Sequence, residues 1–260
     1  MISQNFAKKY QEKIKIIITK NILLNRLIKN KKILITGCSS GLGFSLTKEL
    51  ALYGNKIYCL GKRKIIGDNI KSVKCNLKDI KKIKNKLRVL IDQKFIDYII
   101  LNAGILGVVK KINELNINEV EEAFKINFLA NKEIIDYFIN KKIKTDIIIA
   151  ISSGAALFPK VGWYPYCGSK SALKFLMESY AIEFSNRKFI NIAPGLIKTK
   201  MQDQICKIDA KKINSVKKFQ DLNRNNLIPS PEQVAKNIIR ILPSLKKIKS
   251  GSFLDIRNNN

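Results

Sequence analysis

Residues 33–43 read ILITGCSSGLG, and this stretch decides the fold. Its first three residues are apolar, as expected of a buried strand in a parallel sheet. Gly37, Gly41 and Gly43 follow, and residues 44–52 then have the pattern of an amphipathic helix. A strand, a glycine-rich turn and a helix in this order are typical of a dinucleotide-binding site. There, the first glycine allows the tight turn, the second lets the backbone approach a pyrophosphate, and the third lets helix and strand pack closely.

Strand-like runs alternate with helical patterns along the rest of the chain. Ser230-Pro231-Glu232-Gln233 is a capping-box signal for the start of the last helix. The alternation predicts an α/β fold in which one doubly wound (Rossmann) parallel sheet of about seven strands carries helices on both faces. We expect this single domain to span 31–260. The strands are expected at 33–35, 56–60, 72–75, 98–101, 147–151, 189–192 and 252–256, and the helices at 44–52, 80–90, 120–140, 165–186 and from 231 onward.

Polar and small residues follow most of the expected strands. In a doubly wound sheet, ligands bind at the carboxyl ends of the strands. The segments 37–43, 61–63 and 102–104, together with Ser153 and Pro194, all fall at such ends. This coincidence predicts one functional cleft.

The end of the second strand bears on the choice of cofactor. In NAD-binding proteins a carboxylate here accepts a hydrogen bond from the ribose 2′-hydroxyl. This chain instead has Gly61-Lys62-Arg63, with no acid before Asp68. Two cations and no carboxylate suit a 2′-phosphate, so we expect NADP(H) to be preferred over NAD(H). The alternative is that Lys62 and Arg63 are ordinary surface charges.

A candidate catalytic group lies between Ser153 and Lys170. Tyr166 and Lys170 are four positions apart, so on a helix they share one face. An ammonium group next to a phenol favours the phenolate, which predicts a lowered pKa for Tyr166. Ser153 ends the apolar run 147–151 and would meet the pair at the rim of a pocket. Tyr164 is the poorer candidate acid because Gly168, not a lysine, stands four positions after it.

Composition excludes several other chemistries. The 260 residues contain no histidine, which removes Ser-His and Cys-His nucleophiles and argues against a zinc site or any other metal site. The five cysteines are scattered without a C-x-x-C pair, which indicates reduced thiols and a cytoplasmic protein. No apolar run is long enough for a transmembrane segment, and no secretory signal is recognisable.

The net charge of +29 raises the alternative of a nucleic-acid-binding protein. Most of the basic residues are lysine, isoleucine and asparagine are also abundant, and all three have A/T-rich codons. The lysines are spread along the chain rather than clustered. We therefore attribute the charge to genome composition and expect no dedicated nucleic-acid partner.

Two segments lie outside these motifs. Residues 1–30 form a basic N-terminal extension with an Ile/Leu stripe, which is either a helix packed on the domain, a loosely ordered segment, or a membrane-surface or targeting helix. We expect that its deletion leaves a soluble enzyme. Residues 195–229 are less regular and are expected to form a mobile lid over a substrate.

With these motifs in order, the chain resembles the short-chain dehydrogenase/reductase family over about residues 31–256, and within it the sepiapterin reductase and benzil reductase branch. The matching positions are Thr36-Gly37-x3-Gly41-x-Gly43, Asn102-Ala103-Gly104, Asn127, Ser153, Tyr166-x3-Lys170 and Pro194-Gly195-x3-Thr199. Asn76 departs from the family pattern, because the family usually has an aspartate at this position, near the adenine.

The resemblance implies reduction of a small ketone or dicarbonyl by NADPH. Tyr166 would donate the proton, Lys170 would lower the pKa of Tyr166 and hold the nicotinamide ribose, Ser153 would bind the substrate oxygen, and Asn127 would hold a relay water. Ser153, Trp163 and Asp255 would contact substrate, and Asp255 would anchor the amino group of a pterin unless it is a turn or surface carboxylate paired with one of the many lysines. The expected cofactor-binding residues are Gly37, Ser39, Ser40, Gly41, Leu42, Gly43, Lys62, Arg63, Asn76, Leu77, Asn102, Ala103, Gly104, Tyr166, Lys170, Pro194, Gly195, Ile197 and Thr199.

Two other functions stay open at this point. The same residues would serve a 3-oxoacyl-thioester (acyl carrier protein) reductase. A protein of this fold that binds the cofactor without turnover, in a regulatory role, is the alternative of another class. By resemblance, a homodimer or homotetramer is expected, formed through the two long helices that carry Asn127 and Lys170.

Overall fold

The computed structural model describes residues 27–258. The strands are β1 (Lys32–Thr36), β2 (Lys56–Gly61), β3 (Ile70–Lys74), β4 (Phe95–Leu101), β5 (Lys144–Ile151), β6 (Lys188–Ala193) and β7 (Phe253–Asp255). The α-helices are α2 (Gly41–Ala51), α3 (Ile80–Leu90), α4 (Ile117–Phe124), α5 (Ala130–Asn140), α6 (Tyr164–Glu183), α7 (Lys200–Cys206), α8 (Lys217–Arg224) and α9 (Pro231–Ile241). The shorter helical turns are η1 (Ile112–Glu114), η2 (Lys125–Leu129), η3 (Gly154–Ala156), η4 (Asn214–Val216), η5 (Leu242–Lys247) and η6 (Ile256–Asn258).

The seven strands form one parallel sheet in the order β3-β2-β1-β4-β5-β6-β7. The chain runs outward from β1 to β3 and then returns to the other side of β1 with β4, so the order reverses between β1 and β4. Ligands of doubly wound sheets bind at this reversal. The predicted α/β fold with a single sheet is therefore confirmed.

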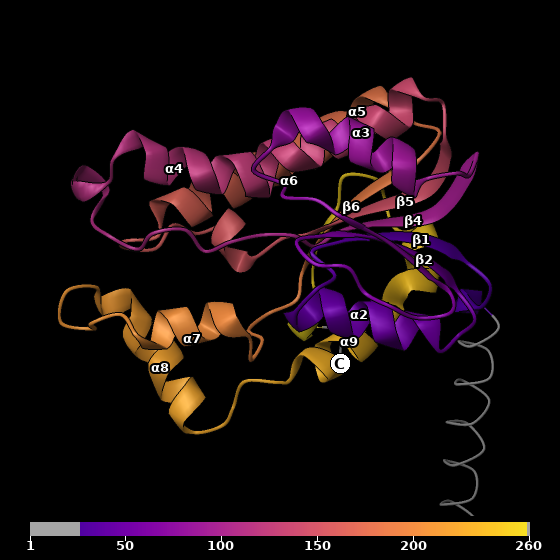
Figure 1. Cartoon of the computed structure of the whole chain (residues 1–260). Helices are drawn as coiled ribbons and strands as arrows, with labels where there is room; N and C mark the ends of the chain where they lie inside the picture. Colours follow the sequence, from indigo (N-terminus) through magenta and orange to yellow (C-terminus); the bar gives the residue numbers. More distant parts are fainter. Residues whose placement is uncertain (1–26, 259–260) are drawn as a thin grey trace, which may run out of the picture.

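Helices cover both faces of the sheet (Figure 1). On one face, α3, α5 and α6 bury residues such as Leu87, Phe138 and Met177 against the strands. On the other face, α2 and α9 bury residues such as Leu46 and Ile238. Neighbouring strand residues point to opposite faces, and both faces of this sheet are covered, which explains the nearly continuous apolar runs of the central strands.

Most element boundaries lie within three residues of the predicted ones, and two of the differences have a clear structural cause. β3 spans 70–74 rather than 72–75, because its pairing with β2 already begins at Ile70 opposite Ile57. The helix expected over 120–140 is divided into α4 and α5 by η2, a π-helical turn. A π-turn adds one residue to a helical turn, which hydrophobic periodicity alone does not reveal.

The packed domain begins before the expected boundary at residue 31. Ile28 is 1% exposed and belongs to the core beneath α2. Asn30 donates a backbone hydrogen bond to the Tyr53 carbonyl, and the Lys31 backbone N–H donates to Asn55 Oδ1 at 2.6 Å. Residues 27–30 are therefore part of this domain, and the rest of the expected N-terminal extension lies outside the described residues.

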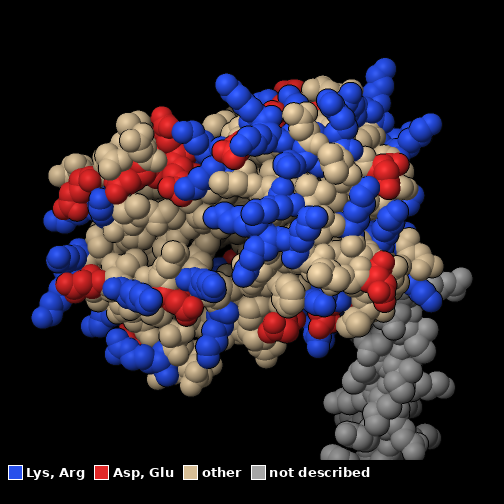
Figure 2. Space-filling model, in the orientation of Figure 1, with Lys and Arg blue, Asp and Glu red and all other residues tan. Residues whose placement is uncertain are grey.

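The remaining predicted elements can be located directly. Ser230 caps α9 through the expected capping box with Gln233. Within 195–229, α7 and α8 lie apart from the sheet, opposite α4 (Figure 1). Figure 2 shows lysine and arginine side chains spread over the whole visible face, with acidic side chains among them.

Candidate active site

A cleft of about 680 Å³ opens at the carboxyl ends of β1, β4, β5 and β6. Gly37, Gly104, Ser153 and Gly195 line it, each following one of these strands. These four strand ends, which are among the five named from the sequence, therefore meet in one cavity, at the reversal of strand order.

The glycine-rich turn after β1 packs too tightly for side chains at its glycine positions. Gly37 has a φ of +69°, and a Cβ on it would lie 2.8 Å from the Cα of Ala103. A Cβ on Gly43 would lie 2.3 Å from the Gly37 carbonyl oxygen. Gly41, the second glycine of the turn, has a φ of +52°, and a Cβ on it would lie 3.1 Å from the Thr199 side chain. The turn thus forms a narrow cradle between α2 and the segment after β6.

A threonine ties the turn to the end of β4. The Thr36 hydroxyl accepts hydrogen bonds from the backbone N–H groups of Asn102 and Ala103, both at 3.0 Å. Asn102 returns a bond from Nδ2 to the Thr36 carbonyl at 3.0 Å. Sequence reasoning gives Thr36 no role beyond its place in the family motif. The feature that could have revealed this role is a hydroxyl residue directly after the apolar run 33–35.

Asn127 lies within η2, where it is fully buried. Its Oδ1 accepts from the Ile105 N–H at 2.8 Å, and its Nδ2 donates to the Ile105 carbonyl and to Ser169 Oγ, both at 2.9 Å. The side chain therefore fastens the loop after β4 to α6. Sequence reasoning missed Ser169 and assigned Asn127 only a bound water, which stays a prediction.

Lys170 projects from α6 toward the end of β5. It is 4% exposed, and its Nζ donates to the Ile151 carbonyl at 2.7 Å. Among residues 27–258 it has no carboxylate partner. Burial without such a partner disfavours the ammonium form and lowers the pKa of Lys170 to about 8. A Cβ on Gly104 would lie 3.5 Å from Lys170 Nζ and 3.2 Å from Asn127 Oδ1, so these three residues meet.

Tyr166 lies one helical turn before Lys170 and also lines the cleft. Burial raises the pKa of its phenol, and the neighbouring Ser153 hydroxyl opposes this shift. The lowered pKa predicted from the sequence is therefore wrong for the protein without cofactor. The reason is that the lysine is itself buried, at 5.9 Å from the centre of the tyrosine ring, and burial disfavours the charged form of both groups.

Ser153 stands two residues after the last residue of β5 and caps the turn η3. Its Oγ accepts from the Ala155 N–H at 3.2 Å and faces the same cleft as Tyr166 and Lys170. The expected trio of Ser153, Tyr166 and Lys170 is thus brought together at one end of the cavity.

Apolar side chains form the walls around this trio. The rings of Trp163 and Tyr166 meet edge to face, with centroids 6.2 Å apart. Phe219 on α8 packs on Trp163 at 5.2 Å. Of these wall residues, sequence reasoning named Trp163 but missed the others, because they lie at irregular spacing in the loop after β4 and in the expected lid. The missed wall residues are Leu106, Met201, Ile205 and Phe219.

The other end of the cleft holds most of the expected cofactor residues. Lys62 lines it, while the neighbouring Arg63 donates from Nη2 to the Ser39 carbonyl at 3.2 Å. Asn76 does not line the cleft, and its Oδ1 accepts from the Lys78 N–H at 3.3 Å. The expected residues that line this end are Ser39, Ser40, Gly41, Leu42, Leu77, Asn102, Ala103, Pro194, Ile197 and Thr199.

Asp255 is placed away from the trio. It ends β7, does not line the cleft, and accepts from Arg257 Nε at 2.8 Å and 3.1 Å, with a further bond from Nη2. This pairing with Arg257 holds the pKa of Asp255 below its ordinary value. The structure thus has a paired carboxylate, as in the alternative expectation, but the partner is an arginine rather than a lysine. A substrate amino group would have to displace Arg257 to use Asp255.

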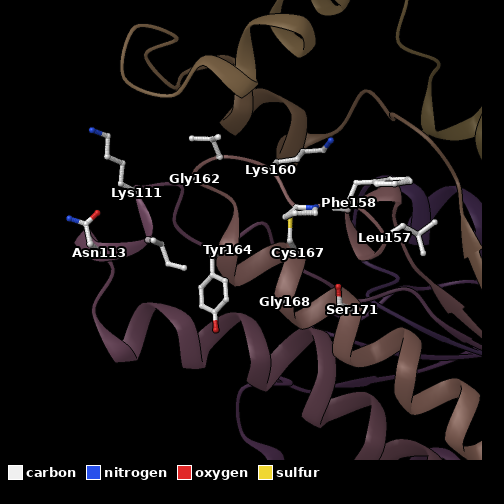
Figure 3. A pocket seen from close by; sticks show the side chains of 14 residues that line it. Lys111, Asn113, Leu157, Phe158, Lys160, Gly162, Tyr164, Cys167, Gly168 and Ser171 are labelled. Carbon is white, nitrogen blue, oxygen red and sulfur yellow. The ribbon is translucent and has the colours of Figure 1, made fainter.

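A second hollow of about 620 Å³ lies on the other side of loop 155–162 (Figure 3). Tyr164, Phe158 and Cys167 line it, and only Ala155 and Lys160 line both cavities. Tyr164 is therefore separated from the trio, which agrees with the choice of Tyr166 from spacing.

The residues of the main cleft fit a nicotinamide dinucleotide. The glycine cradle leaves room for a pyrophosphate at the start of α2, and the cavity continues from there to Tyr166 and Lys170. Among residues 27–258, no group of three or more His, Cys, Asp or Glu residues could hold a metal ion. Within the same residues, no helix combines the length and apolarity that crossing a membrane requires.

Comparison with known proteins agrees with this geometry. Residues 31–209 match the family model described as short chain dehydrogenase. The benzil reductase ((S)-benzoin forming) of Bacillus subtilis is 24% identical over 86% of this chain and 97% of its own length. The 3-oxoacyl-(acyl-carrier-protein) reductase of Rickettsia typhi is 30% identical over 67% of this chain and 76% of its own length.

Among solved structures, a short-chain dehydrogenase/reductase of Saccharomyces cerevisiae superposes with a TM-score of 0.77 at 24% identity, covering 88% of this chain and 97% of that one. The chain therefore belongs to the short-chain dehydrogenase/reductase family and is an NAD(P)-dependent oxidoreductase.

Proposed function

We propose that this protein is an NADPH-dependent carbonyl reductase that acts on small ketones and dicarbonyls. The observation that carries the proposal is the position of Ser153, Tyr166 and Lys170 at the closed, apolar end of a cleft whose other end is a glycine cradle. The likeness to benzil reductase over nearly the whole chain supports this substrate class.

In this reaction the nicotinamide supplies a hydride to the carbonyl carbon. Tyr166 donates its phenolic proton to the carbonyl oxygen, and Ser153 donates a hydrogen bond to the same atom. Both donors are fixed in place before the charge on that oxygen develops, so they stabilise the transition state more than the substrate. Lys170 restores the proton of Tyr166 and holds the nicotinamide ribose. A pKa of about 8 lets Lys170 exchange protons readily near neutral pH.

The preference for NADPH rests on the residues after β2. Lys62 lines the cleft and Arg63 lies beside Ser39 of the glycine turn, and the nearness of both cations to the turn supports this preference. The carboxylates of the cleft, Glu119 and Glu122, belong to α4 and are paired with Lys110 and Lys78. Neither takes the place of the acid that would accept from a free ribose hydroxyl.

The test is a spectrophotometric screen for NADPH oxidation over diketones, pterins and 3-oxoacyl thioesters. We expect turnover with diketones. Oxidation with none of these carbonyls would contradict the proposal and favour a cofactor-binding regulatory protein without turnover.

A second candidate is a 3-oxoacyl-thioester reductase, which the likeness to the Rickettsia enzyme favours. It would use the same trio. Turnover confined to acyl thioesters in the same screen would select it over the dicarbonyl reductase.

We also propose that the protein is cytoplasmic and works as a homodimer or homotetramer. All five cysteines are free thiols, as a reducing compartment requires. Large apolar side chains on α6, Phe175 and Ile182, are exposed in the single chain, at 72% and 84%. Exposed apolar residues of this size on one long helix favour a contact between copies.

A further inference from the structure

Three aromatic rings run in a row from the lid to the catalytic phenol. Phe219 on α8 packs on Trp163 with centroids 5.2 Å apart and an angle of 31° between the rings. Trp163 in turn meets Tyr166 edge to face at 6.2 Å. Phe219 is half-buried, and both it and Trp163 line the cleft, so part of the phenylalanine ring borders the space next to the phenol.

The position of Phe219 is fixed by polar contacts between the two lid helices. Gln202 on α7 is 3% exposed and donates from Nε2 to the Phe219 carbonyl at 3.1 Å. Gln220 donates back to the Ile208 carbonyl at 2.7 Å. The ammonium of Lys160 lies 5.8 Å from the centre of the Phe219 ring, on the loop that leads to Trp163. The ring is thus held in place before a substrate arrives.

The other wall residues near the trio are apolar, and among the described residues no carboxylate that lines the cleft is left without a cationic partner. Leu106, Met201 and Ile205 complete the wall. Asp255 is paired with Arg257 outside the cleft, and the glutamates of the cleft are paired on α4. The described residues therefore offer an uncharged ring a large apolar contact and offer an amino-bearing pterin no free carboxylate.

We propose that Phe219, packed on Trp163, is a specificity-determining residue that selects carbonyl substrates bearing an aryl ring next to the reacting carbon. The ring of the substrate lies against Phe219 and Trp163 while its carbonyl oxygen meets Ser153 and Tyr166. This inference rests on the proposed function and names its substrate class. An alkyl diketone offers the same carbonyl without the ring and gains little from this wall.

The experiment compares benzil with butane-2,3-dione as substrates of the full chain with NADPH. In Phe219→Ala, we expect kcat/KM for benzil to fall about 10-fold to 100-fold, mainly through KM, because the apolar contact of one ring is lost. The value for butane-2,3-dione should fall much less. Phe158→Ala is the matched control, because this exposed phenylalanine lines only the second hollow (Figure 3). It should leave the ratio of the two values unchanged.

A readout besides turnover is the fluorescence of Trp163, the single tryptophan of the chain. Benzil should quench it in the wild type and require a higher concentration to do so in Phe219→Ala. If both substrates lose activity equally in Phe219→Ala, or if Phe219→Leu keeps the full preference for benzil, the aromatic selection is refuted. If the wild type reduces neither substrate, the proposed function fails, and the quenching titration still decides whether the wall binds an aryl ring.

Discussion

Gly43 and Gly37 are packed so closely that a Cβ on Gly43 would lie 2.3 Å from the carbonyl oxygen of Gly37. The contact joins the first turn of α2 to the residue after β1, and it brings the helix start to the edge of the cleft. No rotation of a side chain relieves such a clash, because the atom that would be struck belongs to the backbone.

Gly43→Ala should therefore disrupt the turn and destabilise the protein. We expect the free energy of unfolding to fall by at least about 2 kcal/mol, since the helix must move away from the strand. Gly154→Ala is the control, because nothing lies within 4 Å of the added Cβ there. Chemical denaturation of both variants checks the difference, and equal stability of the two would contradict the packing.

Tyr166→Phe keeps the ring and removes the proton donor. Turnover should fall by roughly 10²-fold to 10⁴-fold, while NADPH still binds. Tyr164→Phe is the control, because it removes a phenolic hydroxyl from a residue that lines the second hollow, and its turnover should be unchanged. Steady-state kinetics together with a cofactor titration measure both effects. A near-normal rate in Tyr166→Phe would exclude Tyr166 as the acid.

Lys170 should make stability depend on pH in a defined window. Its pKa is about 8 in the folded chain, and about 10.4 is ordinary for an unfolded one. Between these values the unfolded state binds more protons, so the cost of burying the ammonium is full below pH 8 and disappears as the pH rises toward the upper value.

Lys170→Met removes this titration. The free energy of unfolding of the wild type relative to Lys170→Met should rise by about 3 kcal/mol across that window. Lys174→Met is the control, since Lys174 on the same helix is paired with Glu178 at 2.6 Å and reaches solvent. Denaturation curves at several pH values measure the slope, and a flat difference for Lys170→Met would show that its ammonium is not penalised by burial.

The pair Lys62 and Arg63 should distinguish the two cofactors. Replacing both with alanine is expected to weaken NADPH binding about 10-fold or more, because a charge-assisted contact to the 2′-phosphate is lost. NADH binding should change little. Lys64→Ala, at the next exposed position, is the control. Equal losses for both cofactors would mean that the pair is only surface charge.

Ile28 tests where the domain begins. Ile28→Ala should lower the free energy of unfolding by about 2–4 kcal/mol, because it empties a site in the core beneath α2. Leu27→Ala, one residue earlier and 48% exposed, should change it by less than about 0.5 kcal/mol. The expectation that deletion of residues 1–30 leaves a soluble enzyme is revised accordingly, since that deletion removes a core residue. Equal effects of the two substitutions would contradict the revised boundary.

Local patterns in the sequence account for most of the sheet and for the position of the trio Ser153, Tyr166 and Lys170. β1, the glycine turn and α2 follow one another without a gap, so their order alone indicates their arrangement. Tyr166 and Lys170 share a helix, so the helical period places them on one face. Ser153 follows the end of a strand, and the strand end therefore indicates its position. The parallel topology then brings these ends together, because every strand points the same way.

Other features depend on contacts that no local pattern contains. The packing of Trp163 on Phe219 joins two segments far apart in the sequence, and nothing in the segment 195–229 has the periodicity of a long helix. The pKa of Tyr166 depends on how deeply it is buried, which is a property of the whole domain. The partner of Asp255 is only two residues away, but several basic residues compete for such a carboxylate in a chain of this charge.

The π-turn η2 gives the helix between β4 and β5 one residue more than a regular α-helix of the same rise. Asn127 lies inside this turn and holds both Ile105 and Ser169. Removal of one of the other residues from 125–129 would let the helix close into regular geometry and rotate Asn127 by about 100° relative to one of its two flanking helices. The number of residues in this turn is therefore as important as their identity. We expect substitutions that keep this number to disturb the contacts of Asn127 less than the deletion of a single neighbouring residue.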